Sequence, residues 1–182
     1  MLHILHIYPE TIVDGEGIRY SIYLSGCRHH CPECHNPESW NPQAGETLTQ
    51  QRISDMIREI NANPLLDGIT FSGGDPLYNP SEFLSLVKEI KEKTHQNIWC
   101  YTGYTCKEIL LYPELSAILP YIDVLVDGKF EKNRKSPHLH FRGSDNQQII
   151  RISHTPGKEE AQNIPLTRLI PATNASTSSL VL

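Results

Sequence analysis

The sequence lacks a long hydrophobic run, an excess of positive charge and a second pair of cysteines. No apolar stretch approaches the ~20 residues of a membrane-spanning helix, and the N-terminal residues carry neither the charged start nor the cleavage site of a secretory signal. We therefore expect a cytoplasmic protein that does not contact a membrane. The 16 basic and 21 acidic residues give a formal net charge of −5, which argues against a direct nucleic-acid partner because such proteins normally carry a basic excess.

Cysteine is scarce, and three of the five cysteines are concentrated in one short loop. Cys27, Cys31 and Cys34 follow the spacing Cys-x3-Cys-x2-Cys, in a segment with too many polar and turn-forming residues to be a core element. Thiolates this close can converge on one metal centre if the backbone folds around it, and a sulfur-only ligand set is typical of zinc or of an iron–sulfur cluster. The odd cysteine count and the missing secretory signal argue against a structural disulfide.

The fourth ligand distinguishes between these two kinds of metal centre. A structural zinc site is closed by four ligands, usually as two separated pairs of Cys or His. Cys100 and Cys106 stand alone, and we expect both to be structural thiols; His29, His30 and His35 lie within the loop itself. A cubane cluster held by three cysteines has one iron without a protein ligand, and that iron can bind a small molecule. We therefore favour a three-cysteine iron–sulfur cluster, with zinc closed by a nearby histidine as the alternative.

Strand and helix patterns alternate along the chain after the first 18 residues. Runs of β-branched and aromatic residues predict strands at 19–24, 68–72, 97–101, 122–126 and 147–152. Apolar residues at helical spacing predict helices at 50–61, with Thr49 as the cap, and at 82–93, 107–111 and 113–119. This alternation predicts βαβ units, and 182 residues are too few for a complete eight-fold barrel of ~250 residues. The predicted fold class is α/β, a single domain with a partial (open) βα barrel and a mainly parallel sheet.

Four of the predicted strands end in a polar motif that contains glycine. These motifs are the cysteine loop, Gly73-Gly74-Asp75-Pro76, Thr102-Gly103-Tyr104 and Asp127-Gly128-Lys129. Because active sites of parallel α/β folds form at the carboxyl ends of strands, we expect the four motifs to gather on one face. Residues 153–182 have no such pattern, so we divide the chain into a domain at 1–152 and an irregular or mobile C-terminal extension at 153–182.

The ordered set of motifs resembles the radical S-adenosylmethionine superfamily, and residues 1–152 would then form its domain. Within that superfamily the chain is similar to the activating enzymes of glycyl-radical enzymes, and among these to the group that acts on anaerobic ribonucleoside-triphosphate reductase. The segments that carry the resemblance are 12–19, 25–37, 72–77, 101–104, 126–130 and 142–147. Glu33 is a departure, because many superfamily members carry an aromatic residue just before the third cysteine.

The resemblance implies that Cys27, Cys31 and Cys34 hold a 4Fe-4S cluster whose open iron chelates S-adenosylmethionine. Reductive cleavage of that cofactor would yield a 5′-deoxyadenosyl radical, which would abstract hydrogen from a glycine of the reductase to form a glycyl radical. The implied partners are the anaerobic ribonucleoside-triphosphate reductase and reduced flavodoxin or a similar electron donor. No catalytic side chain is implied beyond the cluster ligands.

The resemblance also implies a set of residues that line the S-adenosylmethionine site. They are Glu33, Cys34, His35, Gly73, Gly74, Asp75 and Thr102. Gly73 and Gly74 allow close backbone approach and offer carbonyl acceptors to the ammonium group, although a simple turn with Asp75 as its cap also explains this motif. Arg19 and Arg142 are expected at the surface, either docking a partner or forming ion pairs.

Two alternative functions remain open at this point. The first is activation of another glycyl-radical enzyme, such as pyruvate formate-lyase. The second belongs to a different class, an interaction module in which the cysteines hold structural zinc.

Overall fold

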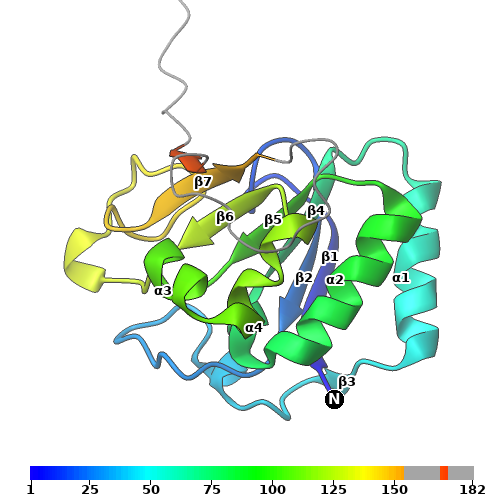
Figure 1. The fold of residues 1–182 in the computed structure, drawn as a ribbon, viewed down its shortest axis with the longest axis horizontal. Helices are drawn as coiled ribbons and strands as arrows, with labels where there is room; N and C mark the ends of the chain where they lie inside the picture. The colour runs from blue at the N-terminus through cyan, green and yellow to red at the C-terminus, as the bar shows by residue number, and fades with distance from the viewer. Residues whose placement is uncertain (154–168, 172–182) are drawn as a thin grey trace, which may run out of the picture.

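The computed structural model describes residues 1–153 and 169–171, which form one mixed sheet in the strand order β3-β1-β2-β4-β5-β6-β7-β8 (Figure 1). The strands are β1 (His3–Thr11), β2 (Arg19–Leu24), β3 (Glu46–Thr47), β4 (Gly68–Gly73), β5 (Ile98–Tyr101), β6 (Val124–Asp127), β7 (Gln148–Ile152) and β8 (Leu169–Pro171). The α-helices are α1 (Gln50–Ala62), α2 (Pro80–Thr94), α3 (Cys106–Leu111) and α4 (Pro113–Ser116). Short 3-10 helices lie at Pro37–Trp40, Pro76–Tyr78, Leu119–Tyr121 and Lys132–Arg134.

The centre of the sheet is parallel and its two sides are antiparallel. Strands β2, β4, β5 and β6 pair in parallel, as expected from βαβ units. On one side β1 pairs antiparallel with β2 and with β3, and on the other side β7 pairs antiparallel with β6 and with β8. The sheet is open, which confirms the mixed α/β class. The curvature of a partial barrel stays a prediction.

The predicted helices and the five predicted strands are present in the structure, which adds the strands β1, β3 and β8. Strand β1 falls in the first 18 residues, where we predicted no strand. In the C-terminal extension, residue 153 and Leu169–Pro171 are described, and Leu169–Pro171 pair with β7 as a short strand. The division of the chain at residue 152 stays a prediction. The prediction for the rest of 154–182 lies outside the described residues.

The main core lies between the sheet and the helices. Helix α1 begins after Thr49, whose side-chain oxygen accepts a hydrogen bond from Arg52 N at 3.2 Å, so the predicted cap is confirmed. Phe71 of β4 and Phe83 of α2 meet edge to face at 5.0 Å. This core holds the central strands rigidly and fixes the position of their carboxyl ends. No helix in the described residues combines the length and the apolar character needed to cross a membrane.

The other face of the sheet holds a smaller cluster around Trp99 and a buried arginine. Arg19 is 1% exposed, donates to Thr70 Oγ1 at 2.7 Å and to Ile69 O at 2.6 Å, and lies 5.3 Å from the Trp99 ring. Burial lowers the pKa of this guanidinium to about 10. The expectation that Arg19 serves at the surface is therefore wrong, because its charge is satisfied inside the protein by acceptors from β4 and its neighbours.

Candidate metal centre

The polar motifs that follow the four parallel strands lie together, as expected from the sheet. Each motif is tied to a neighbouring strand or motif by a short backbone hydrogen bond. These bonds run from Gly74 N to Leu24 O (2.8 Å), from Asp75 N to Gly26 O (2.8 Å), from Thr102 N to Val126 O (2.9 Å) and from Gly128 N to Tyr104 O (2.9 Å). The cysteine loop therefore sits directly against the Gly-Gly-Asp-Pro turn.

The cysteine loop leaves β2 through a tight turn and is closed by the short helix at Pro37–Trp40. Gly26 has φ +100°, and its N–H donates to Ser39 O at 2.7 Å. Cys34 N donates to Cys31 O at 3.1 Å, which turns the second half of the loop back on itself. Cys27 is buried, and Cys31 and Cys34 are half-buried. The loop thus presents its three thiols at different depths, at the carboxyl end of β2.

Backbone groups act on the sulfur atoms of the three cysteines. Burial raises the pKa of the Cys27 thiol, while hydrogen bonds from the backbone of His29 and His30 act to lower it. Burial likewise raises the pKa of Cys31, against a hydrogen bond from the Phe130 backbone. Cys34 Sγ accepts a hydrogen bond from the N–H of residue 36 at 3.4 Å. Such donors stabilise thiolate sulfur and tune iron–sulfur centres, so the donor set fits a soft metal cluster.

In the part of the chain that the structure describes, no group of three or more His, Cys, Asp or Glu side chains is arranged to hold a metal ion. The assignment of Cys27, Cys31 and Cys34 as ligands stays a prediction from their spacing and from the loop that carries them.

Asp75 is the most heavily bonded side chain near the loop. Its side chain is 1% exposed and accepts hydrogen bonds from Leu77 N (2.8 Å), Gly103 N (3.0 Å) and Thr102 Oγ1 (2.9 Å). It also lies 2.7 Å from His29 Nε2. The predicted turn cap is confirmed by the bond to Leu77 N. A contact between Asp75 and S-adenosylmethionine stays a prediction, because the carboxylate already holds the protein's own groups together.

The two glycines of this turn are required by the packing of the backbone. Gly73 has φ +102°, and a Cβ added there would lie 2.4 Å from the Leu24 carbonyl oxygen. A Cβ at Gly74 would lie 2.5 Å from the Gly26 carbonyl oxygen. Any side chain at these positions would push the turn away from the cysteine loop. The expected role of their carbonyls toward an ammonium group stays a prediction.

Glu33 and His35 point toward the segment that follows β6. Both are exposed, and the Glu33 carboxylate forms an ion pair with Lys132. His35 Nε2 lies 3.3 Å from Lys135 Nζ, and its ring lies 6.0 Å from that of Phe130. Thr102 is buried instead, and its hydroxyl is bonded to Asp75. The expected contacts of Glu33, Cys34, His35 and Thr102 with S-adenosylmethionine stay predictions.

The Arg-Gly-Ser-Asp-Asn-Gln segment holds the loop that follows β6. Gln147 accepts from Gly143 N at 2.8 Å and donates to Gly128 O at 2.8 Å. Asn146 Nδ2 donates to the carbonyl of Lys129 at 2.8 Å. Arg142 donates to the Gln147 carbonyl at 2.8 Å, a backbone contact that we did not expect for it. This motif is scaffolding that fixes the chain beside the cysteine loop.

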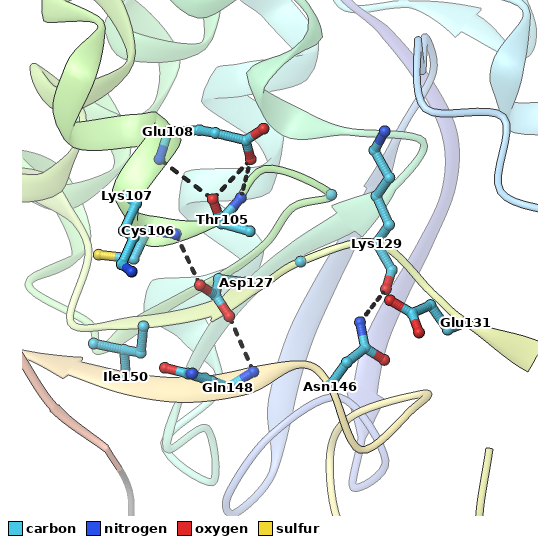
Figure 2. A pocket seen from close by; sticks show the side chains of 12 residues that line it. Thr105, Cys106, Lys107, Glu108, Asp127, Lys129, Glu131, Asn146, Gln148 and Ile150 are labelled. Atoms are coloured by element: carbon cyan, nitrogen blue, oxygen red, sulfur yellow. Dashed lines mark hydrogen bonds between the residues drawn. The ribbon is translucent and has the colours of Figure 1, made fainter. Parts of the chain in front are cut away.

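A pocket of about 710 Å³ opens beside the ends of β5 and β6 (Figure 2). Asp127 lines it and accepts hydrogen bonds from Cys106 N at 2.8 Å and Gln148 N at 3.0 Å. Burial raises the pKa of Asp127 and raises that of Cys106 to about 11. Asp127 thus joins the start of α3 to β7, and Cys106 and the fully buried Cys100 are structural thiols, as predicted.

Sequence reasoning missed two residues that organise this region, His29 and Asp127. Both were visible only as members of polar motifs. Their partners lie 46 and 21 residues away in the chain, so no local spacing could indicate these contacts.

Comparison with known proteins finds relatives that match most of the length of this chain. It is 38% identical over 156 residues to the anaerobic ribonucleoside-triphosphate reductase-activating protein of Pasteurella multocida (strain Pm70), covering 84% of this chain and 99% of that protein. Identity to the protein of the same name from Vibrio cholerae serotype O1 is 41% over 150 residues, covering 80% and 96%. The Escherichia coli (strain K12) protein of that name is 39% identical over 146 residues, covering 78% and 94%.

The chain belongs to this family. A family model described as a 4Fe-4S single cluster domain matches residues 13–150. The matched span includes the cysteine loop and all the motifs that follow the parallel strands. The resemblance to the activating proteins of anaerobic ribonucleoside-triphosphate reductase, which the sequence motifs predicted, is therefore confirmed.

Proposed function

We propose that this protein activates anaerobic ribonucleoside-triphosphate reductase by forming a glycyl radical on it, using S-adenosylmethionine and a 4Fe-4S cluster held by Cys27, Cys31 and Cys34. The observation that carries the proposal is the cysteine loop at the end of β2, with backbone amides at its sulfur atoms and the Gly-Gly-Asp turn packed against it. The 4Fe-4S family model and the names of the relatives support the same activity.

Cys27, Cys31 and Cys34 would hold the cluster, which would supply the one electron needed for reductive cleavage of S-adenosylmethionine to methionine and a 5′-deoxyadenosyl radical. The chain's own residues bind and orient S-adenosylmethionine. The carbonyls of Gly73 and Gly74 accept from the ammonium group, Thr102 lines the methionyl or ribose side, and the backbone from Glu33 to His35 lines the adenine. Asp75 keeps these segments in register through its bonds to the turn and to β5.

The proposal includes two protein partners and a compartment. A glycine of the reductase receives the radical centre, and its polypeptide covers the open site so that water does not quench the radical. Reduced flavodoxin or a similar low-potential donor supplies the electron, because reductive cleavage needs a cluster near the low end of the range of roughly −700 to +450 mV. The cytoplasm provides the reducing conditions that keep the three thiols available.

The test is anaerobic reconstitution followed by metal analysis and electron paramagnetic resonance. We expect iron and sulfide in the protein, a reduced-cluster signal that changes when S-adenosylmethionine is added, and 5′-deoxyadenosine in the same sample. Cys31→Ala should lose all three, whereas Cys106→Ala, outside the loop, should keep them. Zinc without sulfide would contradict the proposal and support the interaction module.

The identity of the protein partner needs a separate measurement. The reduced protein is mixed with S-adenosylmethionine and with either anaerobic ribonucleotide reductase or pyruvate formate-lyase. We expect the glycyl-radical signal on the reductase alone. A signal on pyruvate formate-lyase of equal size would favour the other activase.

A further inference from the structure

His29 lies between two of the predicted cluster ligands, and its side chain is directed into the protein. Its side chain is 9% exposed, and Nε2 lies 2.7 Å from an oxygen of the Asp75 carboxylate. The ring meets Tyr104 edge to face at 4.7 Å. Gly103 packs against it so closely that a Cβ there would lie 2.3 Å from the ring. The imidazole is therefore contacted by three residues from the segments that directly follow β4 and β5.

The neighbouring histidine offers a contrast within the same loop. His30 is exposed, and its ring lies 4.8 Å from that of Trp40, in the short helix that closes the loop. The start of the loop is already anchored by backbone bonds from Gly26 N to Ser39 O and from Cys27 N to Trp40 O. The His29 contact adds a second anchor, toward the strands and away from that helix.

The partner of His29 joins the segments that would hold S-adenosylmethionine. Asp75 follows Gly73 and Gly74 directly, and it accepts from Thr102 Oγ1 and Gly103 N at the end of β5. One buried carboxylate therefore connects the loop of cluster ligands with both segments expected to contact the cofactor. Hydrogen bonds to charged groups are shorter and stronger than neutral ones, so this link resists displacement.

We infer that His29 is a positioning residue for the reaction proposed above, and this inference rests on that proposed function. Its hydrogen bond to Asp75 fixes the segment from Cys27 to Cys31 relative to Gly73, Gly74 and Thr102. The cluster and S-adenosylmethionine are thereby kept at one separation and orientation. A misplacement of about 1 Å can lower a rate by about 10²-fold, so the loss of this bond should be visible in turnover even when the cluster is bound.

The test compares three variants of the reconstituted holoprotein with the wild type. His29→Phe keeps an aromatic ring against Tyr104 and Gly103 but removes the hydrogen-bond donor. His29→Gln keeps a donor at the position of Nε2, and His6→Phe, at an exposed histidine of β1 outside the cysteine loop, is the matched control. Iron and sulfide per chain, the electron paramagnetic resonance spectrum with and without S-adenosylmethionine, and KM and kcat for 5′-deoxyadenosine formation are measured on each.

We expect His29→Phe to lose the spectral change on adding S-adenosylmethionine and to lower kcat by about 10²-fold. His29→Gln should restore the spectral change and most of the rate, and His6→Phe should match the wild type. If His29→Phe fails to bind the cluster, binding by His29→Gln supports the same inference, since the donor is what the two variants do not share.

Two results would overturn the inference while leaving the proposed function intact. One is a His29→Phe protein with wild-type spectra and kinetics. The other is a His29→Gln protein as impaired as His29→Phe, which would mean that the ring is needed and the hydrogen bond is not. A wild-type protein that binds the cluster but forms no 5′-deoxyadenosine would instead overturn the proposed function, and the inference with it.

Discussion

Asp75→Asn should destabilise the cluster-free protein strongly, although it changes a single atom. Each carboxylate oxygen of Asp75 accepts from a backbone N–H: Oδ1 from Leu77 and Oδ2 from Gly103. Asparagine offers one oxygen, so whichever way the amide is turned, one of these N–H groups faces an NH2 group. An unsatisfied buried donor costs about 1–3 kcal/mol, and weaker bonds to the remaining donors add to that. We expect a loss of about 3 kcal/mol in the free energy of unfolding.

The assay is thermal unfolding of the cluster-free protein, followed by circular dichroism in reducing buffer. For a chain of this length each kcal/mol shifts Tm by roughly 2–4 °C, so Asp75→Asn should lower Tm by about 6–12 °C. Asp145→Asn is the matched control, because that carboxylate is 55% exposed and its ion pair with Arg134 lies at the surface. Such a pair contributes about 0–1 kcal/mol. Equal shifts in the two variants would refute the view that Asp75 is a structural connector.

Three further predictions concern other parts of the fold. Gly74→Ala should prevent cluster binding, measured as iron per chain, because its Cβ would lie 2.5 Å from the Gly26 carbonyl oxygen; normal iron content would contradict this. Arg19→Leu should lower Tm by about 6–12 °C, because the hydrogen bonds of the buried guanidinium are lost and the leucine fills its site poorly. A change in Tm of less than about 2 °C would show that the buried charge contributes no net stability. Glu108 has its pKa lowered from 4.5 by the hydrogen bonds of the Thr105 backbone and hydroxyl. Because the pKa of Glu108 is lower in the folded than in the unfolded protein, the ionised side chain stabilises the fold above pH 4.5, and this stabilisation is lost as pH falls through the folded pKa. The Tm difference between wild type and Glu108→Gln should therefore shrink from pH 6 to pH 3, and a constant difference would refute this.

The parallel part of the fold could be predicted from the sequence because its signals are local. Strands β4 and β5 are short apolar runs that end in glycine-containing motifs, and β2 combines β-branched and aromatic residues. Strand β1 gave no such signal. It contains His3, His6 and Pro9, most of its residues are not buried, and its pairing with β2 is interrupted by irregularities in register. Its position is decided by pairing with β2, which the first 18 residues alone do not show.

The candidate site was predictable where spacing carries the chemistry. Three cysteines within eight residues identified the loop, and the Gly-Gly-Asp-Pro motif identified a turn with Asp75 as its cap. The burial of Arg19 could not be predicted, because apart from the Glu16 carbonyl its acceptors come from residues about 50 and 78 positions away. The same reason hid the contact between His29 and Asp75. Long-range hydrogen bonds of single polar side chains leave no periodic trace in a sequence.

The open sheet ends in very short strands, of two residues in β3 and three in β8. A longer exposed edge would present a row of unpaired N–H and C=O groups, on which a strand from another molecule could add and the sheet could grow. Strand β3 pairs only with His3 and Ile4 of β1, so in the described residues the rest of β1 also lies at an edge. The irregular register of β1 against β2 discourages the addition of a further strand there, and we expect the proposed protein substrate to be recognised by the loops at the carboxyl ends of the parallel strands.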